Sequence, residues 1–151
     1  MNWSHVALNC ARISVTEEFY TRWFGFRRAR AFELGDVRIV FLRLGDSYLE
    51  LFGPAREPEP AAAAPPASPE ADGPQLLGTV RHIAFQTDDV PGFLERMGEH
   101  AHITLGPLDF SEFIEGWRSV WITDPDGVVV EVSQGYKDPS DAGADAAAPV
   151  G

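Results

Sequence analysis

The fold is decided by the stretch Asp124-Pro125-Asp126-Gly127-Val128-Val129-Val130-Glu131-Val132. Asp-Pro-Asp-Gly is turn chemistry, because proline presets φ, aspartate caps its own backbone and glycine accepts a positive φ. The valines that follow favour a strand. Strand alternation places Glu131 on the face of Val129 and Ser133, where a buried carboxylate is costly unless it is paired or bound to a metal ion. A single glutamate in such a strand indicates only an exposed sheet face. It becomes evidence for a functional site if a second strand in the chain carries a glutamate in the same way.

The composition indicates a globular protein of one domain. The chain has 151 residues, of which 44% are hydrophobic and 23% charged, and this length allows one ordinary core. The formal net charge of −11 argues against nucleic acid or an anionic membrane surface as a partner, since both select basic patches. No apolar run approaches the roughly 20 residues of a membrane helix, and the N-terminus has no signal-like segment, so we expect a cytoplasmic protein. The single cysteine, Cys10, excludes an internal disulfide and is expected to be a small buried residue.

The first third of the chain predicts a strand followed by a helix. Residues 3–9 alternate as a strand that carries His5. Ser14-Val15-Thr16-Glu17 has the form of a capping box and predicts the start of a helix, which Gly25 ends.

Two further strands are predicted after a basic patch at Arg27, Arg28 and Arg30. They cover residues 37–44 and 47–52, and the second carries Glu50 on one face.

The segment from Pro54 to Gly78 differs in kind from its surroundings. Its 25 residues include seven prolines and seven alanines. Such a segment buries too little apolar surface to offset its ordering entropy, so we predict a linker that is mostly disordered.

The same pattern then returns. Residues 80–87 predict a strand that carries His82, and Asp88-Asp89-Val90-Pro91 opens a helix that runs to about Gly98. The second copy of the pattern ends with three predicted strands: a short one at 103–105, a clearer one at 116–123 and the strand with Glu131. The histidine and the glutamate are 45 residues apart in the first copy and 49 apart in the second.

This internal repeat predicts the domain organisation. We expect a first βαβββ module at residues 1–53, the linker at 54–78, a second module at 79–136 and a flexible tail at 137–151. The fold class is then α+β, with two half-sheets that pair into an incomplete barrel because neither module is large enough alone.

Equivalent positions in the two halves should converge in such a barrel. Convergence would gather two imidazoles and two carboxylates, from His5, Glu50, His82 and Glu131. This mixed nitrogen and oxygen set suits Ni, Co, Zn, Fe or Mn, and an octahedral ion would keep two positions for water or substrate.

The duplicated pattern resembles the vicinal oxygen chelate superfamily, which includes glyoxalase I, methylmalonyl-CoA epimerase, extradiol dioxygenases and the fosfomycin and bleomycin resistance proteins. The segments that carry the resemblance are Ser4-His5-Val6-Ala7, Tyr48-Leu49-Glu50-Leu51-Phe52, Arg81-His82-Ile83-Ala84-Phe85 and Asp124-Pro125-Asp126-Gly127 with Glu131-Val132. The His/Glu/His/Glu set is most similar to that of bacterial glyoxalase I. Epimerases usually carry glutamine where this chain has Glu50, and Arg38 stands nearest to their second catalytic carboxylate.

The resemblance implies metal-assisted proton transfer next to a carbonyl group, with Glu131 favoured as the base and Glu50 as the second candidate. It also implies a small-molecule substrate and a homodimer. Two alternatives stay open: an iron-dependent ring-cleaving dioxygenase, and a non-catalytic protein that binds a small molecule or antibiotic.

Four other residues are candidate substrate contacts. Trp117 and Trp121 share a strand face and are expected either to pack in the core or to form an aromatic wall of the cavity. Asn9 lies on the predicted His5 face, and Arg38 offers a cation on a neighbouring strand.

Overall fold

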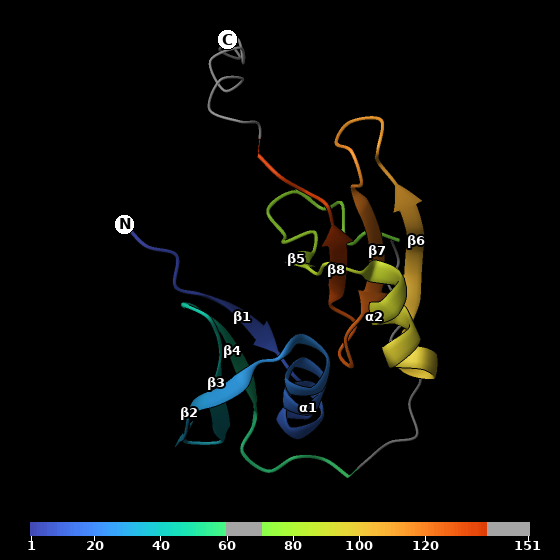
Figure 1. Ribbon diagram of the computed structural model, residues 1–151. Coiled ribbons are helices and arrows are strands. Elements are labelled where there is room, and N and C mark those ends of the chain that lie inside the picture. The colour runs from blue at the N-terminus through green and yellow to red at the C-terminus, as the bar shows by residue number, and fades with distance from the viewer. Residues whose placement is uncertain (60–70, 139–151) are drawn as a thin grey trace.

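The computed structural model describes residues 1–59 and 71–138 and contains two four-stranded sheets (Figure 1). The first sheet has the order β1-β4-β3-β2 and the second the order β5-β8-β7-β6. The elements of the first repeat are β1 (His5–Asn9), α1 (Ile13–Phe24), β2 (Arg27–Leu34), β3 (Val37–Leu44) and β4 (Ser47–Pro54). Those of the second are β5 (Ile83–Gln86), α2 (Val90–Met97), the 3₁₀ turn η1 (Gly98–His100), β6 (Ile103–Asp109), β7 (Arg118–Thr123) and β8 (Val129–Gln134). The predicted α+β class and the βαβββ repeat are confirmed, and the two sheets do not close into one barrel.

The first and last strands of each repeat run parallel and side by side. In the first sheet Ala7 of β1 lies opposite Glu50 of β4. In the second sheet Ala84 of β5 lies opposite Glu131 of β8. This pairing crosses the whole repeat, so the histidine at its start is brought next to the glutamate at its end.

The start of α1 differs from the prediction. Arg12 is the N-cap and makes no side-chain capping bond, so the capping box expected at Ser14 is wrong. The Ser14 N–H and hydroxyl instead donate to the carboxylate of Glu57, and this side chain from the segment after β4 takes the role expected of Glu17. The predicted end is confirmed, because Gly25 takes a φ of 76° in the left-handed region.

The basic patch at residues 27–30 belongs to an edge strand, β2, which the sequence analysis missed. All eight of its residues are exposed, and Arg28 pairs with Glu17 of α1. Charged edge strands discourage pairing with other chains, but their composition hides the strand pattern.

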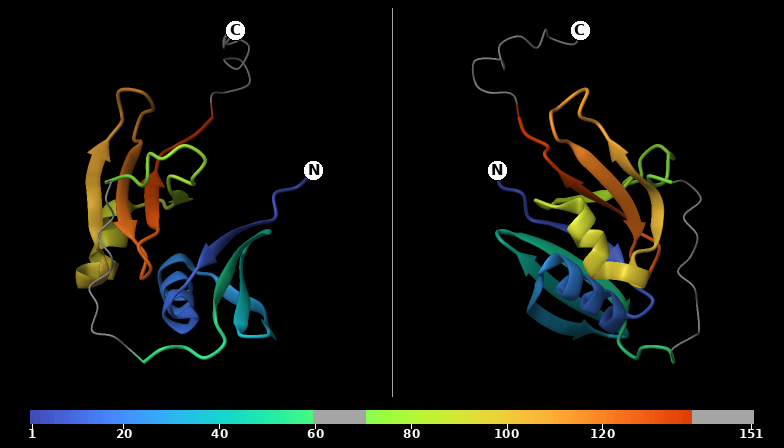
Figure 2. Two further views of the ribbon diagram at one scale, coloured as in Figure 1. Left: turned by 180° about the vertical axis from the view of Figure 1, so that it is seen from behind. Right: turned by 45° about the vertical axis from the view of Figure 1, so that its right-hand side comes forward.

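One hydrophobic core joins the two repeats. It contains Tyr20 of α1, Leu51 of β4 and Val132 of β8, all at most 1% exposed. Phe24 at the end of α1 packs against Phe85 of β5, with ring centroids 4.6 Å apart. Both views of Figure 2 show α1 between the first sheet and the second repeat.

The Asp-Pro-Asp-Gly turn fastens the second repeat to α1. Asp124 accepts hydrogen bonds from the N–H groups of Asp126 (2.9 Å) and Val128 (2.8 Å) and from the Tyr20 hydroxyl (2.9 Å). Asp126 accepts from the Ala11 N–H at 2.8 Å and the Thr16 hydroxyl at 2.6 Å. The turn therefore reverses the chain and also holds the second repeat against α1 of the first repeat.

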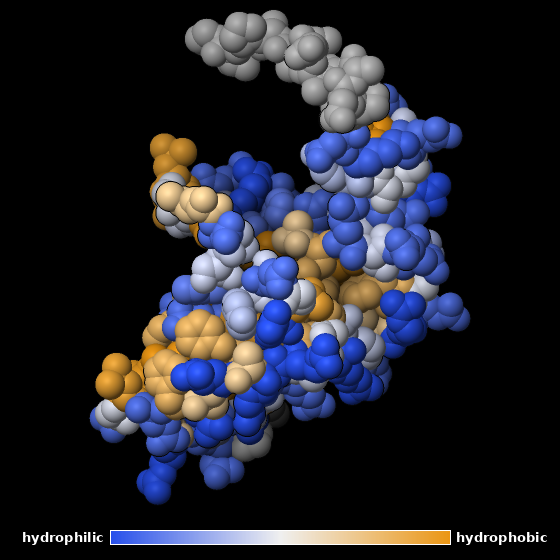
Figure 3. Space-filling view, turned by 60° about the vertical axis from the view of Figure 1, so that its left-hand side comes forward, coloured by the Kyte–Doolittle hydropathy of each residue, from blue (hydrophilic) through white to orange (hydrophobic). Residues whose placement is uncertain are grey.

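The outer face of the first sheet is apolar and exposed. Phe32 is 45%, Leu34 71% and Val37 40% exposed. Strand register places them on the face of Glu50, because Phe32 lies opposite Ile39, Ile39 opposite Phe52, and Phe41 opposite Glu50. Figure 3 shows apolar side chains gathered over this sheet.

No described helix is long and apolar enough to cross a membrane.

Candidate metal centre

The first histidine and glutamate meet on the outer face of the first sheet. Nε2 of His5 lies 3.2 Å from Oε2 of Glu50. Nδ1 of the same ring is 2.9 Å from the hydroxyl of Ser4, and Phe41 packs edge-on against the imidazole at 5.8 Å. His5 keeps 39% of its side chain exposed and Glu50 only 15%, so the carboxylate is largely covered while the imidazole faces solvent.

The second histidine and glutamate meet in the same way on the second sheet. Nε2 of His82 lies 2.9 Å from Oε2 of Glu131. Nδ1 of His82 is 2.8 Å from the carbonyl oxygen of Asp72. The other carboxylate oxygen, Oε1 of Glu131, accepts a 2.6 Å hydrogen bond from the hydroxyl of Ser119.

The partners of His82 determine which nitrogen carries its proton. A carbonyl oxygen only accepts, so Nδ1 donates to Asp72 and Nε2 is the nitrogen that faces Glu131. Nε2 lies 2.9 Å from the Glu131 carboxylate. A nitrogen and a carboxylate oxygen at this separation need a proton or a cation between them. Ligand histidines bind metal ions with this geometry, in which the far ring nitrogen donates to an oxygen.

The two pairs remain apart within one chain. Among residues 1–59 and 71–138, no three or more His, Cys, Asp or Glu side chains gather closely enough to hold one ion. The four predicted ligands therefore do not gather within a single chain, and their convergence, for which the sequence left pairing within one chain or across a dimer open, stays a prediction. Parallel pairing brings His and Glu together inside each repeat, but the two sheets share no strand edge that would join the pairs.

Of the two tryptophans, Trp121 lies beside the second pair, and Trp117 packs against Phe110 and Tyr136. Trp121 of β7 stands opposite Glu131 and packs edge-on against His82 with a centroid distance of 6.3 Å. It is only 6% exposed, and its buried indole N–H has no hydrogen-bond partner among the described residues. Phe110 packs on Trp117 at 4.8 Å and on Trp121 at 6.3 Å. Trp121 is thus buried and also borders the second pair, and the substrate-contact role expected of both tryptophans stays a prediction.

Asn9 and Arg38 are placed on different faces. Asn9 shares the outer face with His5 and lies opposite Phe52. Arg38 alternates onto the other face of β3, with the buried Val40 and Leu42, and lies 4.0 Å from Glu33. The structure thus keeps Asn9 on the side of the first pair and turns Arg38 away from it.

Two groups at the second pair were missed by the sequence analysis. Ser119 shares a strand face with Trp121, so β-alternation toward Glu131 is a signal that could have identified it. Asp72 lies in the segment predicted to be a linker. There the Arg81 guanidinium bonds its carboxylate at 3.0 Å and lowers the pKa of Asp72. Residues 60–70 of that linker, and residues 139–151 of the predicted tail, lie outside the described residues.

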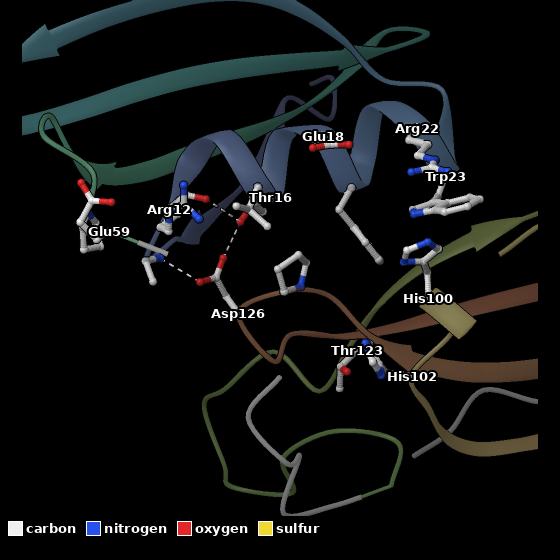
Figure 4. Close-up of a pocket in the computed structure, with 15 residues that line it drawn as sticks. Arg12, Thr16, Glu18, Arg22, Trp23, Glu59, His100, His102, Thr123 and Asp126 are labelled. Carbon is white, nitrogen blue, oxygen red and sulfur yellow. Dashed lines mark hydrogen bonds between the residues drawn. The ribbon is translucent and has the colours of Figure 1, made fainter. Parts of the chain in front are cut away.

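A separate cavity of about 480 Å³ lies between α1 and the Asp-Pro-Asp-Gly turn (Figure 4). Trp23, with His100 packed at 5.7 Å, borders one end of it, and Arg12 lies toward the other. None of the four candidate ligands lines it, so this cavity is separate from the two pairs of imidazole and carboxylate.

Comparisons with known proteins agree with the fold. A family model described as Glyoxalase/Bleomycin resistance protein/Dioxygenase superfamily matches residues 3–132. The solved structure of a protein named SMU.1112c is 25% identical, covers 88% of this chain and 98% of its own, and superposes with a TM-score of 0.66. A glyoxalase family protein from Enterococcus faecalis is 29% identical, covers 85% of this chain and 94% of its own, and has a TM-score of 0.58.

A trypanothione-dependent glyoxalase I from Leishmania major shares the fold at 23% identity, with 86% of this chain and 84% of its own covered and a TM-score of 0.58. A comparison with curated protein sequences finds no match. The repeat, the topology and the family model lead to one conclusion: the chain belongs to the Glyoxalase/Bleomycin resistance protein/Dioxygenase superfamily.

Proposed function

We propose that this protein is a divalent-metal-dependent enzyme that transfers a proton next to a carbonyl group of a small molecule, as in glyoxalase I. Its ligands would be His5, Glu50, His82 and Glu131, and the ion would be Ni, Co, Zn, Fe or Mn. The observation that carries the proposal is the 2.9 Å approach of His82 Nε2 to the Glu131 carboxylate, with Nδ1 of the same ring bonded to the Asp72 carbonyl. The same contact at His5 and Glu50, at 3.2 Å, supports it.

We further propose that a second copy of the chain completes the site. The His5–Glu50 pair and the His82–Glu131 pair each supply one imidazole and one carboxylate, which is half of the four proposed ligands. The face that carries His5 and Glu50 also exposes Phe32, Leu34 and Val37, and an exposed apolar patch of this kind favours an interface. In a twofold dimer, the first pair of one chain would meet the second pair of its partner, and two equivalent sites would form.

The proposed chemistry divides between the ion and the side chains. A bound ion would supply Lewis-acid stabilisation for negative charge on the substrate oxygens. Glu131 would take the proton from the carbon beside the carbonyl at Oε2 and return it to the neighbouring carbon, with Glu50 as the alternative base. Trp121 and Phe110 would form an apolar wall that excludes water from the transfer.

Mixing two inactive variants tests the ligand set and the dimer together. One variant carries His5→Ala and Glu50→Gln, and the other carries His82→Ala and Glu131→Gln. We expect each alone to lose stoichiometric Co(II) binding, while the mixture after subunit exchange recovers one site per heterodimer. The recovered site combines the intact first pair of one chain with the intact second pair of the other.

Other outcomes of this experiment are equally informative. Metal binding that survives in both variants would overturn the ligand assignment. Loss in both without recovery, in a mixture shown to contain heterodimers, would overturn the intersubunit site. Native protein that binds no Co(II), Ni(II) or Zn(II) would leave a non-catalytic small-molecule binder, with a proton between His82 and Glu131.

A further inference from the structure

The two halves of the candidate centre are held with unequal rigidity. The contacts of Glu131 include the hydroxyl of Ser119, a residue with 0% exposure, and those of His82 include the backbone of Asp72. At the first pair, His5 contacts the exposed hydroxyl of Ser4. A buried hydrogen bond restrains a side chain more than an exposed one, because water does not compete for it.

Ser119 restrains the rotation of the Glu131 carboxylate. Its 2.6 Å bond takes Oε1, which leaves Oε2 directed at His82. Ser119 lies on β7, in the middle of the second sheet, and its Cα is opposite Ser133 of β8. The donor is therefore carried by a paired strand rather than a loop, and this gives it a fixed position.

The turn at Ala71–Gly73 restrains His82 from the other side. Arg81 bonds the Asp72 carboxylate at 3.0 and 3.2 Å, and Thr104 donates to the Ala71 carbonyl at 2.5 Å. Gly73 has a φ of 110°, and a Cβ there would overlap the carbonyl oxygen of Arg81. Only glycine allows the turn to approach closely enough for the Asp72 carbonyl to reach Nδ1 of His82.

We propose that Ser119 and the Ala71–Gly73 turn are positioning groups that set His82 and Glu131 in ligand geometry before an ion binds. This inference rests on the proposed function for its use, but its geometry can be tested separately. Neither group contacts the ion or the substrate. Each acts through a ligand, as the hydrogen-bond partners of ligands do in other metal sites, where their loss lowers metal affinity about 10- to 100-fold.

The first test removes the hydroxyl with Ser119→Ala, with Ser133→Ala as the matched control. Ser133 is also a buried serine of the same sheet face, 5% exposed. In metal-free crystals we expect the His82–Glu131 contact to be lost in Ser119→Ala and kept in Ser133→Ala. In Co(II) titrations we expect about a tenfold loss of affinity in Ser119→Ala, with the control unchanged. Ser4→Ala should lose less than Ser119→Ala, because water can replace an exposed hydroxyl.

The second test displaces the turn with Gly73→Ala, with Gly78→Ala as the matched control. Gly78 also has a positive φ, of 84°, but a Cβ there meets no atom within 4 Å. Both variants carry the same kind of backbone strain, so a difference between them reports the overlap with Arg81. We expect Gly73→Ala alone to lose the Asp72–His82 contact and to weaken Co(II) binding.

These readouts separate the two proposals. An unchanged His82–Glu131 contact in Ser119→Ala crystals would overturn the positioning role, even if the native protein binds metal. If the contact is lost in Ser119→Ala but native protein binds no ion, the positioning geometry stands and the metal-enzyme proposal fails. Equal metal affinity in Gly73→Ala and Gly78→Ala would overturn the role of the turn.

Discussion

At the residue scale, the two aspartates of the Asp-Pro-Asp-Gly turn have different environments. Asp124 is 1% exposed, and its hydrogen bonds come from two N–H groups and the Tyr20 hydroxyl. Burial raises the pKa of Asp124 from 3.8 to about 6, against the opposing effect of these hydrogen bonds. Burial also raises the pKa of Cys10 to about 12, so the expectation that this thiol is a buried packing residue fits its 6% exposure.

The raised pKa of Asp124 predicts a pH dependence of stability. Between about pH 4 and pH 6 the folded state holds a proton on Asp124 that the unfolded state has released. The free energy of unfolding therefore falls as pH rises through this window, by about 2–3 kcal/mol from this group at most, and levels above it. Urea denaturation of the native protein and of Asp124→Asn, at steps from pH 4 to pH 7, measures the difference.

Three other carboxyl groups, those of Asp72, Glu57 and Asp109, have lowered pKa values, so their contributions to stability rise with pH. These contributions are the same in the native protein and in Asp124→Asn, so the difference between the two pH profiles reports Asp124 alone. The asparagine can still accept from the two N–H groups, so Asp124→Asn should fold. Parallel pH profiles for the two proteins would contradict the assignment.

At the element scale, α1 is held at its start by side chains from elsewhere rather than by its own cap. Glu57 accepts from Ser14, and Asp126 accepts from Ala11 and Thr16. A capping box is a local signal, but any acceptor that reaches the free N–H groups of the first turn can satisfy them. The sequence could therefore predict the helix and its end at Gly25 without revealing what secures its beginning.

From the hydrogen bonds that Asp126 accepts from Ala11 and Thr16, we predict that Asp126→Ala destabilises the protein. The substitution removes the acceptor of the Ala11 N–H and the nearer of the two acceptors of the buried Thr16 hydroxyl, which keeps only the Arg12 carbonyl at 3.3 Å. We expect a loss of about 1–3 kcal/mol in the free energy of unfolding. Asp46→Ala is the control, since that side chain is 103% exposed and pairs with the exposed Arg43; we expect no measurable change there. Equal denaturation midpoints for the two variants would show that the hydrogen bonds of Asp126 contribute nothing to stability.

At the scale of the whole molecule, the proposed homodimer would explain both the exposed apolar face of the first sheet and the separation of the two proposed ligand pairs. Burying Phe32, Leu34 and Val37 removes apolar surface from water, and the same contact would bring the two half-sites together. Within residues 1–59 and 71–138, neither repeat alone brings more than one imidazole and one carboxylate together.

The dimer predicts that Phe32→Asp yields a monomer. A carboxylate at the centre of an apolar interface is desolvated without a partner, so association should weaken by more than tenfold. Sedimentation of the native protein, of Phe32→Asp and of Val15→Asp measures the effect. Val15 is also exposed, at 36%, but lies on α1, and its variant should sediment like the native protein. A native protein that sediments as a monomer at micromolar concentration would contradict the proposed interface.

The sequence by itself determined the duplication, the fold class and the position of each histidine and glutamate at equivalent places in its repeat. These features depend on local turn chemistry and on the two-residue period of strands, which can be read from neighbouring residues. Only the tertiary structure decided that His5 meets Glu50 and His82 meets Glu131 in separate pairs, that Arg38 faces away from them, and that Ser119 and Asp72 hold the second pair. Those outcomes depend on which strands pair and on how closely segments far apart in the chain pack together. A local sequence pattern does not specify either of these.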